Sequence, residues 1–396
     1  MNTIPGIERW LAVWPVATAL VAAGSLLGLE RHRRSGVAPI AILVALGWGL
    51  GQTQVERPFW VPLVVGLVVA ALARDQDDLL HGECALKLLW VMGTALALSW
   101  AGIELLTLAT GTDVVLEQWA VLELGLEPVF LWSTALPLSL LVGVVMLGGA
   151  PFHFWVADVF QGARPWLAPL AVTLLQVTGA GWLSFRLAYV ERFPAGAQLA
   201  WGLMHIAALI ALIAGAATLL VQRRPERRVG TLASLNGALV LVLLASGQPL
   251  EPGWLATWAA HLALALTGAS TVTRFLPVSA HEAGCGAPLA RRHPLATAAG
   301  LLCLASLAGF PGTPGGALWL RVGRSLAHAA ATPLLLALGA TWLAALIVTL
   351  RQVRELTGVP PPSATEVRPV PVQARVALAI SGVGLVALVA LRIAHR

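Results

Sequence analysis

The chain has 396 residues, of which 58% are hydrophobic and only 11% are charged. Soluble domains carry charge on about a quarter of their residues, and one core of this size could not bury so much apolar surface. The composition therefore excludes a soluble globular enzyme. A net charge of +6 does not indicate nucleic-acid binding here, because the basic residues form short clusters between apolar runs, as in loops on the inner side of a membrane. These clusters lie at 31–34, 223–228 and 291–293.

Eleven or twelve apolar runs follow one another along the chain, most of them long enough to cross a bilayer as a helix. The runs are continuous and do not alternate, which favours helices over a β-barrel. We expect an all-α polytopic membrane protein with about 11–13 transmembrane helices, some of them discontinuous. The runs are 10–29, 37–55, 58–73, 88–110, 128–152, 165–185, 193–221, 229–250, 254–273, 294–320, 329–350 and 376–391.

Four segments are expected from this pattern. Residues 1–80 hold N-terminal transmembrane helices, and residues 81–357 form the main helical module. A polar, Pro-rich linker follows at 358–375, before a last transmembrane helix at 376–396. No Walker loop or GxGxxG motif is present, and the three cysteines have no CxxC spacing. We therefore expect no catalytic residue, nucleotide, metal or iron–sulfur cluster in this chain.

Ionisable side chains inside apolar runs are the first candidates for function, because a bilayer makes them costly. Lys87 is the only lysine of the chain and begins a run, so it is either a functional group or an anchor at the membrane surface. Glu104 lies 17 residues further along the same expected helix, which places the two about 25 Å apart. They therefore cannot form a direct ion pair within that helix.

Two histidines, His205 and His261, lie deep within their runs. Imidazole titrates near neutral pH, as a proton path requires. A structural hydrogen bond to a carbonyl on a neighbouring helix is the more frequent explanation for each histidine taken alone. Three arginines nearer the ends of their runs are expected to face an interface or a loop: Arg186, Arg274 and Arg321.

The stretch 148–181 contains several helix-breaking residues. Prolines at its start, and Gly179 and Gly181 further on, indicate a discontinuous helix whose freed backbone groups need other partners. Gln176 lies near this expected break, with Thr173 and Thr178. The segment 152–161 is short and rich in aromatic residues, which predicts an amphipathic helix at the membrane interface.

The run Pro-Phe-His-Phe-Trp-Val-Ala-Asp-Val-Phe-Gln-Gly-Ala at 151–163 resembles a motif of respiratory complex I. It is found in the membrane subunits that descend from cation/proton antiporters, and the likeness is greatest to the subunit N branch (mitochondrial subunit 2). His153 and Asp158 occupy motif positions. Weaker matches lie at 83–87, at Arg227, where the family's eighth helix begins, and at the Ser-Leu-Ala-Gly-Phe-Pro break of 306–311.

This resemblance implies an antiporter-like proton-translocation module over 81–357. The chain would be a membrane subunit of an NADH:quinone oxidoreductase, a translocase that couples quinone reduction to proton movement, in the inner (plasma) membrane of a cell. Its partners would be the other membrane subunits of that assembly and the lipid bilayer. FMN, iron–sulfur clusters and quinone would bind to partner subunits and not to this chain.

The sequence departs from the family at the charged positions of the proton path. The family's broken-helix lysine corresponds to Gln176, its histidine in the eighth helix to Asn236 or Gly237, and its later lysine falls near Trp319. Two alternatives therefore remain open: a structural, non-conducting subunit of the same assembly, and an independent cation/proton antiporter. The candidate proton-path residues are Lys87, Glu104, Gln176, His205 and His261.

Overall fold

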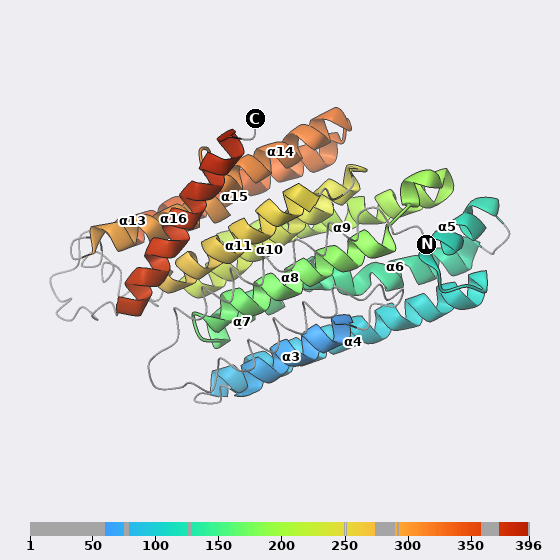
Figure 1. Cartoon of the computed structure of the whole chain (residues 1–396), viewed down its shortest axis with the longest axis horizontal. Coiled ribbons are helices and arrows are strands. Elements are labelled where there is room, and N and C mark those ends of the chain that lie inside the picture. The colour runs from blue at the N-terminus through green and yellow to red at the C-terminus, as the bar shows by residue number, and fades with distance from the viewer. Residues whose placement is uncertain are drawn as a thin grey trace.

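A computed structural model describes residues 60–74, 79–125, 129–248, 250, 252–273, 290, 293–357 and 372–394. Every regular element in these ranges is a helix (Figure 1). The helices are α3 Trp60–Arg74, α4 Leu79–Thr110, α5 Val115–Leu124, α6 Val129–Met146, α7 Phe154–Gly162, α8 Leu167–Arg186, the 3₁₀ helix η2 Val190–Arg192, α9 Pro194–Val221, α10 Pro225–Ala245, α11 Pro252–Thr273, α13 Pro294–Leu307, α14 Pro314–His328, α15 Thr332–Thr357 and α16 Val372–Ala394.

Within these ranges, seven helices are long and apolar enough to cross a membrane. They are Gly82–Thr110, Leu167–Arg192, Pro194–Val221, Pro225–Ala245, Gly253–Thr273, Thr332–Thr357 and Val372–Ala390. Three shorter apolar helices accompany them: Val61–Ala73, Phe130–Met146 and Pro294–Leu307. The predicted all-helical polytopic fold is confirmed. The expected runs at 10–29 and 37–55 and most of the expected linker lie outside the described residues.

The helices α8, α10 and α11 run through the middle of the molecule, with α3 and α4 on one side and α13 to α16 on the other (Figure 1). α8 and α10 are buried along nearly their whole length. Both are apolar or small on all sides, which is the pattern of a helix surrounded by other helices. The outer helices expose bulky apolar side chains, among them Leu108, Ile213, Leu336 and Val383.

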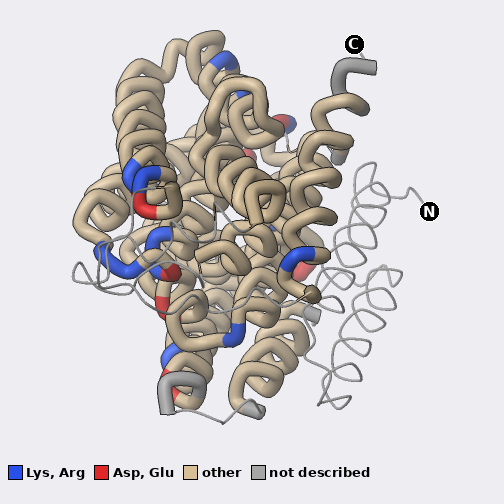
Figure 2. The backbone as a smooth tube through the Cα atoms, turned by 90° about the vertical axis from the view of Figure 1, so that its left-hand side faces the viewer, with Lys and Arg blue, Asp and Glu red and all other residues tan. Residues whose placement is uncertain are grey.

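Charged residues are sparse along the chain, as Figure 2 shows from the end of the bundle that carries α7. An apolar outer surface with few charges is what a hydrocarbon environment requires. The outer surface of the helix bundle is therefore suited to contact lipid. The polar side chains that could have a function lie inside the bundle or at its ends.

The first interruption of a helix separates α7 from α8, and α8 itself is continuous from Leu167 to Arg186. The expected break at Gly179 and Gly181 is therefore wrong. A Cβ atom at Gly179 would meet the carbonyl oxygen of Gly143 on α6 at 2.8 Å. This glycine lets two helices approach closely, a role that sequence alone does not distinguish from a break.

The short helix α7 is not an interfacial helix, contrary to expectation. Most of its residues are buried, including Trp155, Val156, Val159 and Phe160. α7 packs against α4, α8 and α10 within the bundle. Its aromatic side chains therefore contribute to the protein core and not to a membrane-facing surface.

The second interruption separates α13 from α14, at the Ser-Leu-Ala-Gly-Phe-Pro break of 306–311 that the resemblance implies. α13 ends at Leu307 and α14 begins at Pro314. The Oγ1 atom of Thr313 accepts a hydrogen bond from the amide of Gly316 (3.1 Å) and caps α14. The Oγ atom of Ser306 accepts one from the amide of Gly315 (3.1 Å). Hydroxyl groups near the break thus accept hydrogen bonds from the free backbone amides at the start of α14.

Candidate functional site

Gln176 lies at the centre of the bundle on α8 and is fully buried. Its Nε2 donates to the carbonyl oxygen of Leu147 (3.1 Å), just beyond the end of α6, and to that of Ala233 on α10 (3.0 Å). Gly237 leaves room for this contact, because a Cβ there would overlap the Leu147 carbonyl. The amide therefore supplies donors to carbonyls beside the first break, while its Oε1 has no partner among the described residues.

Asn236, one turn after Ala233 on α10, has the same arrangement at the second break. Its Nδ2 donates to the carbonyl oxygens of Leu232 and of Leu307, each at 2.8 Å. Leu307 is the last residue of α13, so no backbone amide of that helix donates to its carbonyl oxygen. The Oδ1 of Asn236 has no partner in the described part of the chain. Both breaks are thus supported by a neutral amide.

His261 on α11 is fully buried, and neither ring nitrogen has a hydrogen-bond partner among the described residues. The backbone of Ser306, one residue before the second break, faces the ring. Gly315, at the start of α14, lies so close that a Cβ there would be 2.9 Å from Nε2. We call Gln176, Asn236 and His261 the central polar line. Gln176 contacts Ala233, one turn before Asn236 on α10. Asn236 and His261 both lie beside the end of α13.

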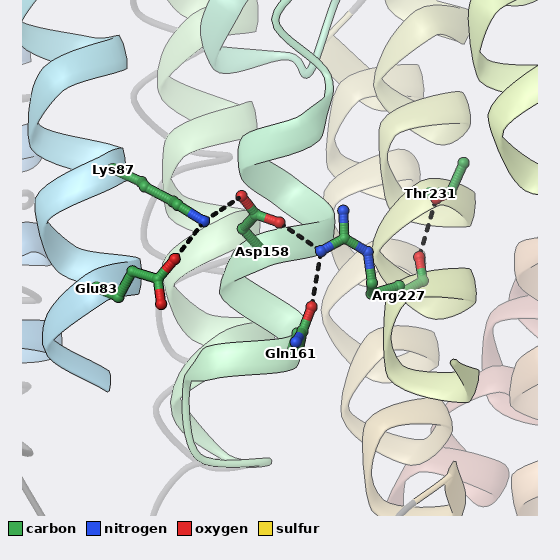
Figure 3. A network of polar contacts seen from close by, with 6 residues as sticks. All are labelled: Glu83, Lys87, Asp158, Gln161, Arg227 and Thr231. Carbon is green, nitrogen blue, oxygen red and sulfur yellow. Dashed lines mark hydrogen bonds and ion pairs between the residues drawn. The ribbon is translucent and has the colours of Figure 1, made fainter. Parts of the chain in front are cut away.

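A charged cluster lies at the end of the bundle that carries α7 (Figure 3). Lys87 on α4 pairs with Glu83 (2.6 Å) and approaches Asp158 on α7 (Nζ to Oδ2, 3.7 Å). Asp158 accepts a hydrogen bond from Nη1 of Arg227 on α10 (2.6 Å), and the same Nη1 donates to Gln161 (2.7 Å). The alternating charges tie α4, α7 and α10 together, so the motif residues of α7 have a structural role at this end.

Hydroxyl groups and His153 lie between the charged cluster and the central polar line. On α10, Thr231 donates to the carbonyl of Arg227 (2.9 Å), and Ser234 lies 3.4 Å from the carbonyl of His153. The Nε2 of His153 is 2.9 Å from the Oγ1 of Thr218 on α9. Burial lowers the pKa of His153 below its ordinary value, which favours the neutral ring.

The structure brings some of the predicted residues together and leaves others apart. Lys87, Asp158 and Arg227 meet in the charged cluster, and Gln176 and His261 belong to the central polar line. Glu104 is exposed on the outer face of α4, and His205 is partly exposed on α9. Neither belongs to the cluster or to the line.

Arg186 is the main residue that sequence reasoning placed wrongly. We expected an interfacial or loop-facing charge, but the side chain is only 4% exposed at the end of α8. Its Nη2 donates to the Oε1 of Gln118 on α5 (3.1 Å). The sequence contains no signal for this burial, because the short helix α5 that covers the site is separated from it by some 60 residues.

Thr349 and Gln352 on α15 are also buried and were not predicted.

The all-helical fold matches that of antiporter-like membrane subunits found in complex I and Mrp assemblies. The chain aligns in three dimensions with chains of three solved assemblies. These are respiratory complex I from Thermus thermophilus (TM-score 0.76, 21% identity, 97% of this chain and 84% of that chain), an archaeal membrane-bound sulfane sulfur reductase (0.78, 14%, 98% and 80%), and the Mrp complex from Dietzia sp. DQ12-45-1b (0.75, 14%, 97% and 81%).

The chain is a distant homologue of NADH-quinone oxidoreductase subunit N. It is 31% identical to that subunit of Halorhodospira halophila over 261 residues, 62% of this chain and 51% of the relative. It is 30% identical to that of Rhodopseudomonas palustris over 303 residues, 74% of this chain and 63% of the relative. The chain thus matches about half the length of the first of these curated relatives. No family model matches.

Proposed function

We propose that this chain is a membrane subunit of an NADH:quinone oxidoreductase-like assembly and contributes to proton translocation coupled to quinone reduction in the inner (plasma) membrane. The observation that carries the proposal is the series of buried polar groups across both helix breaks. The series comprises Gln176, Asn236 and His261, and Ser234, which follows the acceptor Ala233 on α10, donates to the carbonyl of His153. FMN, iron–sulfur clusters and quinone would belong to partner subunits of the same assembly.

Within the central polar line, His261 is the one side chain that can bind and release a proton, because its imidazole ring carries a basic nitrogen. Gln176 and Asn236 cannot hold a proton, but each has a buried side-chain oxygen without a partner among the described residues. Such oxygens can accept hydrogen bonds from water. The chemistry of the chain would therefore be proton transfer through oriented water, with His261 as the titrating group and with the driving energy released in partner subunits.

A second candidate is a structural, non-conducting subunit of the same assembly. The neutral amides favour it, because Gln176 and Asn236 use their donors to hold backbone carbonyls at the breaks. Lys87 is held in ion pairs at the end of the bundle. An independent cation/proton antiporter is less well supported, since the central polar line in the described part of the chain contains no carboxylate or ammonium group to couple the two ions.

Proton pumping by the assembled complex in liposomes distinguishes the first two candidates. The ratio of protons moved to NADH oxidised is measured for wild type, for His261→Ala and, as a matched control, for His205→Ala. We expect the ratio to fall for His261→Ala at normal assembly and to stay unchanged for His205→Ala. If His261→Ala and Glu104→Gln both pump as well as wild type, the conducting candidate is rejected in favour of the structural one.

Mass spectrometry of the proteins that co-purify with the chain tests membership in an assembly. The chain is extracted from its native membrane in mild detergent. We expect flavin and iron–sulfur subunits in the purified material, together with other antiporter-like chains. Recovery of the chain alone, or only with copies of itself, would contradict the proposal and support the independent antiporter.

A further inference from the structure

Arg186 carries a charge that no described residue balances. It is 4% exposed, and its Nε has no hydrogen-bond partner among the described residues. The partner of its Nη2, Gln118, is a neutral amide that is itself 1% exposed. Gln118 in turn donates to the carbonyl oxygen of Thr112 (3.0 Å). A guanidinium group stays protonated in proteins, so this buried network retains a full positive charge.

The two carboxylates of α5 are engaged elsewhere. Glu117 and Glu123 on α5 are both exposed. Oε2 of Glu117 accepts a hydrogen bond from the Oγ1 of Thr112, and Oε2 of Glu123 accepts one from the amide of Ala195. The ion pairs of the described residues do not include Arg186. A buried charge without a counter-charge is strongly unfavourable, and the described residues place no carboxylate against the Arg186 guanidinium.

Further hydrogen-bond donors without acceptors lie at the same end of the bundle. Trp119 connects them: its Nε1 donates to the carbonyl oxygen of Arg186 (3.3 Å), and its ring stacks on Trp132 with the centroids 6.1 Å apart. The Nε1 of Trp132 is buried without a partner among the described residues, as is the hydroxyl of Thr107 on α4. Indole and guanidinium N–H groups can only donate, so the described residues leave these donors without an acceptor.

We propose that Arg186 and Trp132 form a binding site for a monovalent anion of halide size, such as chloride, between α5, α6 and α8. A monatomic anion supplies the negative charge and the hydrogen-bond acceptor together. The site lies at the end of the bundle opposite α7 and the charged cluster (Figure 1). It does not depend on whether the chain conducts protons.

Thermal unfolding of the purified chain in detergent tests the site. The midpoint is measured in sodium chloride and in sodium gluconate at equal ionic strength. An anion that binds only the folded state raises the midpoint, and we expect a rise of about 2–4 °C in chloride for wild type. Arg186→Gln removes the buried charge and is expected to unfold at the same temperature in both salts. Arg192→Gln, which changes an exposed arginine of η2, should respond like wild type.

Trp132→Phe removes one donor and keeps the charge, so we expect a higher chloride concentration for half of the effect. Trp254→Phe is its control, because the Nε1 of Trp254 also lacks a partner but lies on α11. A chloride effect that is equal in all variants, or absent in wild type, overturns the proposal. If Arg186→Gln does not fold, chloride-35 line broadening by wild type, reversed by bromide, takes its place, and absence of that broadening also overturns the site.

Discussion

At the scale of single residues, Gln176 shows how a neutral amide supports a helix break inside a membrane protein. We predict that Gln176→Leu destabilises the chain by about 1–3 kcal/mol, because the carbonyls of Leu147 and Ala233 lose their side-chain donor. Equilibrium unfolding in mixed micelles measures the change.

The matched control for this prediction is Thr173→Val on the same helix. Thr173 is 1% exposed, and its hydroxyl has no partner among the described residues. Removing an unsatisfied buried polar atom is expected to leave stability unchanged or to raise it slightly. An equal loss for both variants would show that packing at this level of α8 matters more than the hydrogen bonds of Gln176.

The sequence indicated several of the buried polar residues but not their hydrogen-bond partners. Gln176, and Asn236 or Gly237, could be singled out because the resemblance at 151–163 implies ionisable groups at these positions. Their acceptors are carbonyls of α6 and α13 that lie 29 and 71 residues away. No local pattern encodes such contacts. Arg186 was misplaced for the same reason, since its cover comes from α5.

At the scale of helices, Asp158 holds α7 between α4 and α10. We predict that Asp158→Ala lowers stability by about 1–3 kcal/mol, because Arg227 loses a short charged hydrogen bond and Lys87 loses one of its two carboxylates. Amide hydrogen exchange should become faster in α7 before it does in α8.

Glu83→Gln is the control within the same charged cluster. The Glu83 side chain is 55% exposed, and exposed ion pairs contribute only about 0–1 kcal/mol. We expect little change in stability and none in the exchange of α7. If Glu83→Gln loosens α7 as much as Asp158→Ala does, the whole cluster and not Asp158 holds this helix.

Two glycines permit the close approach of backbone segments at the breaks. We predict that Gly237→Ala and Gly315→Ala each destabilise the chain by about 2 kcal/mol or more, because the new Cβ would overlap the carbonyl of Leu147 or of Ser306. Gly202→Ala on α9 has no atom within 4 Å of the new Cβ. It should be neutral or stabilise by about 0.5–1 kcal/mol. The midpoint of unfolding in micelles compares the three variants.

Hydropathy predicted the helices better than their breaks. The runs at 193–221 and 329–350 correspond to α9 and α15, and the break expected at 306–311 follows α13. The position of the other break was missed because Gly179 looks like a helix breaker in sequence and is a contact point with α6 in the structure. The prediction of an interfacial amphipathic helix at α7 was wrong for a similar reason. The helices α4 and α10 that bury α7 lie far from it in the sequence.

At the scale of the whole molecule, the position of the basic loops predicts the orientation in the membrane. α9 spans 28 residues, about 40 Å of helix, so the loops at its two ends lie on opposite sides of a bilayer. We predict that Arg224→Cys reacts with an impermeant maleimide from the cytoplasmic side, and Glu191→Cys from the opposite side.

This labelling requires a background in which Cys84, Cys285 and Cys303 are replaced by serine. Right-side-out and inside-out vesicles expose one cysteine each, and a gel shift after labelling reports which one has reacted. The reverse pattern would invert the assigned topology. Reaction of both cysteines from the same side would exclude α9 as a membrane-spanning helix.

The hydrogen bonds of Gln176 also bear on how this chain could change by mutation. Both glutamine codons become lysine codons when their first base is replaced. A Gln176→Lys variant would bring an ammonium group with three donors to a place where the carbonyls of Leu147 and Ala233 already point inward. The contacts that support the helix break are therefore compatible with either residue. A single base change would therefore introduce a positive charge into the central polar line. The backbone around position 176 would not have to change.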